Sequence, residues 1–381
     1  MDREYKRDIP SPETAPVDDS VDKTMYCRLH GDAVPQAGNL RNMEVADMCQ
    51  VRTDMAAECV GAIQEPIDGV EMSESMHSHG IKLTRVMITS REASESLGKP
   101  EGTYLTVDMP VDANTANEAA AYDTCVDLCA QCIRELAGHL SSDAPIMVLG
   151  LGNRYVTADS LGTKVTEQVL VTRHMWDAVP EEITRGIRSM CAIAPGVMGI
   201  TGIETAETVK GLVETVKPCL VLAIDALASR SVERLGRSVQ FSDSGIVPGS
   251  GVGNRRMELS QNTLGVPVIA VGVPTVVDAA TLAVDAVEMT VTGLREQLDK
   301  AEHKEENPEL FGLLDNLTPY QKQLLFREVL YPRIGDMVVT PKDVDALIEK
   351  MSAVISAAIN QAFHGVNTRK QAEEYIWTNV E

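Results

Sequence analysis

The sequence predicts an α/β fold with a mostly parallel central sheet and helices on both faces. Continuous apolar runs within residues 145–153, 220–224 and 266–274 indicate strands that are buried on both faces of a sheet. Amphipathic segments of a dozen or more residues alternate with these runs. Strands that alternate with helices are typical of βαβ units, which build parallel sheets.

The N-terminal part of the chain adds a leader and a small antiparallel element. Residues 1 to about 45 are rich in Asp, Pro and Lys without a sustained period, which predicts a mobile leader. Residues 80–89 alternate apolar and polar side chains, and residues 103–109 supply a partner strand. We expect this antiparallel element to precede the main domain.

Helical periodicity accounts for most of the remaining chain. An amphipathic helix over residues 117–140 opens the main domain, with Cys125, Cys129 and Cys132 spaced along one face. No cysteine pair has the second pair or the nearby histidines of a zinc site, so free thiols are expected. Further helices are predicted over residues 163–174, 203–216, 275–301, 319–330 and 341–363, the last with Thr340 as N-cap and Pro341 at its first position.

Composition and charge exclude several classes of function. The 381 residues are 44% apolar, which is enough to bury a large core. The formal net charge of −22 disfavours direct binding to nucleic acid or to an anionic membrane as the main activity. The N-terminus is polar, and no run of eighteen apolar residues occurs. We therefore expect a cytoplasmic protein without a membrane partner.

Asp225 directly follows the apolar run at residues 220–224 and precedes a segment compatible with a helix. Open α/β sheets place their ligand sites at the carboxyl ends of parallel strands, so Asp225 is a candidate catalytic residue. Asp is also a favoured N-cap, and the alternative is that Asp225 only caps the following helix.

A second carboxylate, Asp159, lies on the loop after the predicted strand at residues 145–153. Two carboxylates at adjacent strand ends can share a proton, because like charges a few ångströms apart do not both ionise readily. One carboxylate then holds a water molecule as general base, while the other donates a proton to the substrate. Asp159 and Asp225 are therefore the candidate acid and base pair.

Other motifs are less specific. The glycine loop at residues 150–162 lacks the G-x-G-x-x-G order, which disfavours a phosphate site. The triplet at residues 243–245 matches pepsin-like proteases, but it occurs once, which favours a turn. The turn with Gly196, Gly199 and Gly202 either presents backbone N–H groups to an oxyanion or peptide, or only packs tightly. His174 is either a ligand or base, or a structural residue.

From about residue 51 to the C-terminus, the chain resembles the germination protease family of spore-forming bacteria. The resemblance rests on ordered segments at residues 150–162, 172–174, 195–205, 223–234, 243–256, 264–279 and 338–345, among them P-G-V-M-G-I-T-G-I-E-T, A-I-D-A-L-A-S-R-S-V-E-R and D-S-G-I-V-P-G-S-G-V-G-N-R-R.

The resemblance implies an atypical aspartic endopeptidase that degrades small acid-soluble spore proteins in the forespore or spore core. It also implies a zymogen, a homotetramer and a fold akin to hydrogenase maturation proteases, with the catalytic aspartates at Asp159 and Asp225. No cofactor or metal ligand is expected. Candidates for substrate binding or support are Gly196, Gly199, Gly202, Glu204, Arg230 and His174.

The segment V-R-T-D-M-A-A-E at residues 51–58 resembles the sites at which the family removes its propeptide. We therefore predict self-cleavage between Asp54 and Met55, and the alternative is a solvated linker. The expected organisation is a leader over residues 1–54 and one protease domain over residues 55–381. Within this domain we expect the β element at 80–110, the core at 117–300 and a helical part at 319–365.

The chain departs from the family pattern beside the first aspartate. Ala158 and Thr163 stand where the family has proline, which predicts a looser loop. Two alternative functions remain open. One is a metal-dependent endopeptidase in which Asp159, Asp225 and His174 hold a divalent ion. The other is a non-enzymatic protein that binds spore proteins through its glycine loops.

Overall fold

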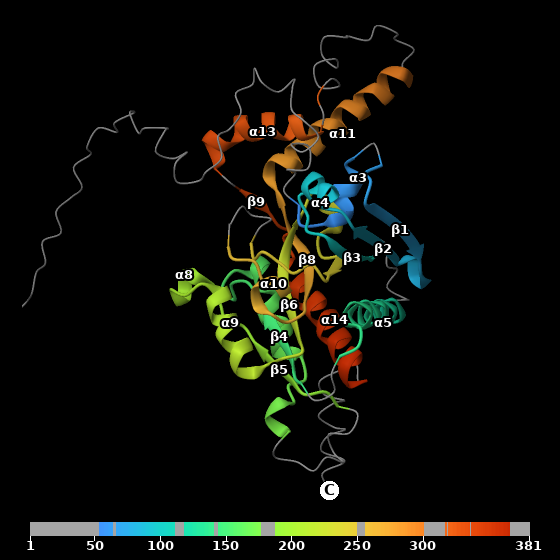
Figure 1. Cartoon of the computed structure of the whole chain (residues 1–381). Helices are drawn as coiled ribbons and strands as arrows, with labels where there is room; N and C mark the ends of the chain where they lie inside the picture. Colours follow the sequence, from blue (N-terminus) through green and yellow to red (C-terminus); the bar gives the residue numbers. More distant parts are fainter. Residues whose placement is uncertain are drawn as a thin grey trace, which may run out of the picture. The chain divides into compact units, whose positions relative to one another are not determined.

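Nine strands form a single sheet in the described part of this computed structural model, in the order β1-β2-β3-β7-β8-β6-β4-β5, with β9 paired to β8 (Figure 1). The structure describes residues 53–63, 66–110, 118–140, 144–176, 187–249, 256–300, 317, 319–335 and 337–365. Most of the predicted leader, residues 1–52, lies outside these ranges.

The centre of the sheet is parallel, as predicted. The strands β5, β4, β6 and β8 are parallel neighbours in that order. Their bounds are β4 Ile146–Gly150, β5 Met190–Ile193, β6 Leu220–Ser229 and β8 Val268–Asp278. All residues of β4 and β8 are buried, which explains their continuous apolar runs.

The predicted antiparallel element is confirmed, and it continues the central sheet. β3 pairs with β7, which in turn pairs with β8. β1 was not predicted from the sequence, and nearly all of its residues are exposed. The bounds are β1 Val70–Met76, β2 Lys82–Ile88, β3 Gly102–Asp108, β7 Ser238–Ser242 and β9 Val338–Val339.

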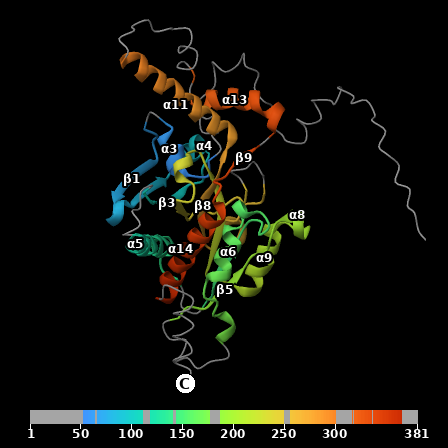
Figure 2. The ribbon, with the colours of Figure 1, turned by 180° about the vertical axis from the view of Figure 1, so that it is seen from behind.

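Helices α5, α6 and α14 cover one face of the sheet, which we call face A. Figure 2 shows α14 beside α5, and the two helices are in contact. Their apolar side chains pack on strand residues such as Leu222 and Ile224. The three helices span Glu118–Ala137, Leu161–Gln168 and Val344–His364. Cys125, Cys129 and Cys132 are buried on this face as free thiols, as predicted.

The opposite face, face B, carries two separate groups of helices. In its antiparallel half, α3 (Ala56–Gly61) and α4 (Arg91–Leu97) pack on Val86 and Tyr104. In its parallel half, α9 (Thr205–Val216) packs with α10 on β4 and β6. The prediction of helices on both faces is therefore confirmed. The other helical segments are η2 Ser78–Gly80, η4 Thr157–Asp159, η5 Arg173–Met175, α8 Met198–Thr201, η6 Val232–Arg234, α10 Gln261–Leu264, α11 Ala279–Lys300 and α13 Pro319–Ile334.

Several predicted boundaries were wrong. β8 continues to Asp278, whose side chain accepts hydrogen bonds from the N–H groups of Ala280 and Thr281 and so caps α11. α6 ends at Gln168 instead of reaching residue 174. α14 begins at Val344, because the Thr340 hydroxyl donates to the Thr275 carbonyl instead of capping a helix. None of the described helices is both long and apolar enough to cross a bilayer.

Candidate active site

Asp225 lies inside β6, at the point where this strand extends past β4. Ile224 pairs with Gly150, the last residue of β4, and Asp225 is the next residue along β6. On the other side, β6 stays paired with β8 as far as Ser229. The prediction that a helix follows Asp225 was therefore wrong, and so was the alternative that Asp225 is an N-cap. The aspartate still lies beyond the carboxyl end of a parallel strand, β4.

The register of the sheet places Asp225 in one row with Gly272 of β8 and Gln240 of β7. Paired residues point to the same face of a sheet, so Asp225 and Gln240 both project from face B. A Cβ at residue 272 would collide with the side chain of Leu227, so the row needs glycine in its middle. Sequence reasoning missed Gln240 and Gly272, because strand register is not visible in a single segment.

Asp159 ends η4, on the loop that follows β4. Its Oδ2 accepts a hydrogen bond from the N–H of Asn153 at 2.8 Å. Gly152 has a φ of +94°, and a Cβ there would lie 2.9 Å from Asp159 Oδ1. Glycine at this position therefore permits both the left-handed backbone and the close approach of the carboxylate.

Gly162 brings the loop of Asp159 onto the end of the sheet. A Cβ on Gly162 would lie 2.5 Å from Ile224 O and from both Leu151 N and Leu151 O. The first turn of α6 thus rests directly on the backbone where β4 ends and where β6 continues. Asp159 precedes this turn, so the contact sets its position relative to Asp225.

Electrostatics couple the two aspartates. Asp225 is only 4% exposed, and burial raises the pKa of its carboxyl well above the ordinary value. The charges of Asp159 and Asp54 raise it further, while the N–H groups of Ala226 and Gly249 oppose the shift. Burial also raises the pKa of Asp159, against the N–H of Asn153 and the charge of Arg256. This arrangement favours a protonated Asp225 beside an ionised Asp159.

The predicted cleavage segment is docked on the same region of the sheet. Asp54 N donates to Ala228 O at 2.9 Å, and Ala228 N donates to Asp54 Oδ2 at 2.8 Å. The carbonyl oxygen of Asp54 accepts from Gln240 Nε2 at 3.0 Å. Met55 has no exposed surface. The alternative of a solvated linker is wrong for this part of the chain.

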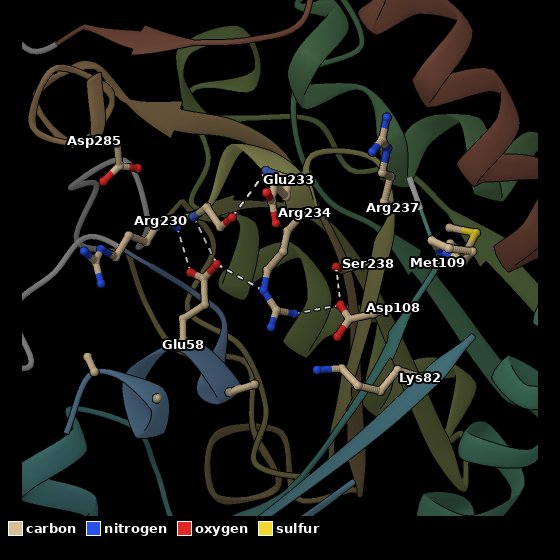
Figure 3. A pocket seen from close by; sticks show the side chains of 15 residues that line it. Glu58, Lys82, Asp108, Met109, Arg230, Glu233, Arg234, Arg237, Ser238 and Asp285 are labelled. Carbon is tan, nitrogen blue, oxygen red and sulfur yellow. Dashed lines mark hydrogen bonds and ion pairs between the residues drawn. The ribbon is translucent and has the colours of Figure 1, made fainter. Parts of the chain in front are cut away.

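Glu58 anchors the residues that follow the predicted cut (Figure 3). Its Oε2 accepts from the N–H of Arg230 at 2.7 Å and its Oε1 from the N–H of Ser231 at 3.1 Å. The guanidinium of Arg234 bridges Glu58 and Asp108, with Nε 3.3 Å from Glu58 Oε1 and Nη1 2.7 Å from Asp108 Oδ1. The predicted support residue Arg230 therefore holds α3 through its backbone, and its side chain lines a cavity of about 570 Å³. Neither Asp159 nor Asp225 lines this cavity.

We expect Glu58→Gln to lower the free energy of unfolding by about 1–3 kcal/mol. The Glu58 side chain is 7% exposed, and the substitution removes one of the two carboxylates that pair with the Arg234 guanidinium. Urea denaturation measures the loss. Glu95→Gln is the matched control, because it breaks the exposed Arg91–Glu95 pair and is expected to change stability little. Equal effects of the two substitutions would contradict the anchoring role.

The remaining glycine candidates lie on the loop after β5. Gly196 has a φ of +79°, and Gly202, with a φ of +73°, ends α8. Gly199 lies inside α8, and Glu204 occupies the N-cap position of α9 without a side-chain capping bond. This loop also exposes about half of each of three apolar side chains, Met198, Ile200 and Ile203. A role in substrate binding stays a prediction.

The structure does not bring His174 to the aspartates. η5 follows Thr172, whose N–H donates to the carbonyl of Met190, the first residue of β5. His174 therefore lies at the amino-terminal end of the parallel strands, opposite the end at which Asp225 projects beyond β4. Among the residues that the structure describes, no group of three or more His, Cys, Asp or Glu side chains is placed to hold a metal ion.

Comparison with known proteins identifies a family whose sequence model matches most of the chain. The sequence model of the germination protease family matches residues 43–304 and 294–376. The chain belongs to the germination protease family. The germination protease of Caldanaerobacter subterraneus is 43% identical over 327 residues, which cover 86% of this chain and 98% of that protein. The germination protease of Clostridium perfringens is 42% identical and covers 83% of this chain and 95% of its own length.

Membership in the germination protease family makes this chain a protease with protein substrates. Among solved structures, a NiFe hydrogenase maturation protease from Thermococcus kodakarensis aligns with 38% of this chain and 80% of its own, at 18% identity and a TM-score of 0.24.

Proposed function

We propose that this member of the germination protease family is an aspartic endopeptidase in which Asp159 and Asp225 form the catalytic pair. The observation that carries the proposal is the buried Asp225 carboxyl, whose pKa is raised by burial and by the charge of Asp159. Asp225 then keeps the shared proton and donates it to the substrate, and Asp159 acts as the base toward a water molecule. Activity requires Asp159 ionised and Asp225 protonated, so both limbs of the pH profile are shifted upward from the ordinary pKa of an aspartate.

We also propose that the chain is a zymogen that cleaves itself between Asp54 and Met55. The docking of Thr53–Met55 on β6 and β7 supports this, because the predicted scissile bond then lies on the face from which Asp225 projects. The charge of Asp54 also acts on Asp225, so the precursor and the processed chain differ in the pKa of that carboxyl. The proposed substrates are small acid-soluble spore proteins, and the proposed setting is a homotetramer in the cytoplasm of the forespore or spore core.

Self-cleavage of the purified full chain tests this function. At mildly acidic and at neutral pH, we expect mass spectrometry to find a new N-terminus at Met55. Asp159→Asn and Asp225→Asn are expected to slow the cut by about 10²–10⁴-fold, the usual contribution of a positioned acid or base. The control Asp68→Asn, at an exposed position, should cut normally. Normal cutting by either active-site variant, or loss of cutting after addition of a chelator, contradicts the aspartic mechanism.

A further inference from the structure

We propose that the open edge of β6, from Ala226 to Ala228, is the binding site for residues that precede the cut, and that an extended peptide adds to it as a strand. The inference rests on the proposed function, and it names the surface by which the same site holds its substrates. Strand addition supplies main-chain hydrogen bonds without requiring a deep pocket, which suits an extended protein segment.

The edge is open because β6 is longer than β4. The β4–β6 ladder ends at Gly150 and Ile224, whereas the β6–β8 ladder continues to Ser229. Leu151 N donates to Ile224 O, so Ile224 turns its N–H and C=O toward β4. Alternate residues of a regular strand turn the same way, so Ala226 also faces this side. The β6–β8 register shifts between Leu227 and Ala228, and Ala228 turns its N–H and C=O to Asp54. On the β4 side, past Gly150, no strand in the described part of the chain pairs with them.

A segment of the chain itself already occupies one end of this edge. Asp54 N donates to Ala228 O, and Ala228 N donates to the Asp54 carboxylate. The edge therefore accepts both a backbone N–H and an acidic side chain. Ala228 is only 3% exposed, so release of Asp54 would leave two buried polar groups without these partners. An incoming peptide with an acidic residue at the same position restores both bonds.

The neighbours of Ala228 favour an extended peptide over a helix. Ala226 N donates to the Asp225 carboxylate at 2.9 Å, so the next position along the edge adjoins the proposed acid. On the other side, Gln240 Nε2 holds the Asp54 carbonyl and Gln240 Oε1 accepts from Ala56 N at 2.8 Å. The Ala56 N–H fixes the orientation of the Gln240 amide, which leaves its NH₂ group for the carbonyl before the predicted cut. The backbone of the residues around the cut is thus held by β6 through Ala228 and by β7 through Gln240.

The test measures binding of a fluorescent peptide with the sequence of residues 50–58 to the full chain, by fluorescence anisotropy. Asp54→Ala removes the carboxylate that occupies the Ala228 N–H, so we expect about tenfold tighter binding of the peptide than by the unaltered chain. Adding Ala228→Pro removes the N–H and should abolish this gain, because proline has no donor. Adding Ala228→Gly keeps the N–H and should preserve the gain.

A second experiment uses the Asp54→Ala chain throughout and changes only the peptide. N-methylation at its Asp removes the N–H that pairs with Ala228 O, and we expect about tenfold weaker binding. N-methylation at the preceding Thr is the control, since alternate residues of a strand turn their N–H groups to opposite sides. Equal binding of the two methylated peptides overturns the proposal. The assay needs no catalysis, so a loss of self-cleavage in Asp225→Asn chains tests the proposed function separately.

Discussion

Asp225→Asn is expected to raise the melting temperature at pH 7 while it lowers self-cleavage by about 10²–10⁴-fold. The folded protein buries this carboxyl, and burial together with the charges of Asp159 and Asp54 makes its ionised form unfavourable. Asparagine has the same shape without a charge, so it removes that cost. Burial of the Asp225 carboxyl thus lowers the stability of the fold while it gives the carboxyl the raised pKa that the proposed reaction needs.

The contribution of Asp225 to stability decreases as pH rises, because folding raises the pKa of its carboxyl. A carboxyl whose pKa is raised by folding stabilises the protein fully below its unfolded value of 3.8, and this contribution is lost as pH rises through the folded value. The asparagine side chain does not titrate in this range. The melting temperatures of the variant and the unaltered chain should therefore be close near pH 4 and diverge toward pH 7.

Differential scanning calorimetry at several pH values measures this divergence. Asp68→Asn serves as the matched control, because Asp68 is exposed and its replacement should leave the pH profile unchanged. A variant that melts lower than the unaltered chain at pH 7, or a difference that does not depend on pH, would show that Asp225 is not destabilised by its burial.

Gly162→Ala is expected to destabilise the fold by about 1–3 kcal/mol and to reduce self-cleavage by about 10²-fold. The added Cβ would lie 2.5 Å from three backbone atoms, Ile224 O, Leu151 N and Leu151 O. Backbone atoms at the end of a sheet do not move aside as a flexible side chain does, so the first turn of α6 must shift. This turn follows Asp159, and its displacement changes the distance between the two carboxylates.

Gly211→Ala is the control for this prediction. Apart from its chain neighbours and its own helix backbone, no atom lies within 4 Å of a Cβ at residue 211, which is inside α9, so the substitution should change stability by at most about 1 kcal/mol and leave cleavage unchanged. Urea denaturation and the rate of self-cleavage measure both variants. Equal losses of cleavage in Gly211→Ala and Gly162→Ala would contradict the role of the contact at Gly162.

The sequence by itself determined the fold class and the place of Asp159 on the loop after β4, whereas Asp225, which was predicted to follow its strand, lies inside β6. The signal was local in each case: the apolar runs of β4, β6 and β8 are buried along their length, and the spacing of Cys125, Cys129 and Cys132 places them on one face of α5. Such periodicity depends only on neighbouring residues, so a single sequence displays it.

Tertiary structure decided the rest. The A-L-A-S segment after Asp225 favours a helix locally, yet it forms a strand because β8 pairs with it as far as Ser229. Strand register joined Gln240 to the row of Asp225, and the length of β4 left the edge at Ala228 open to Asp54. The same topology carried His174 to the opposite end of the sheet. These contacts join residues far apart in the chain, and their energies depend on pairing partners that no single segment encodes.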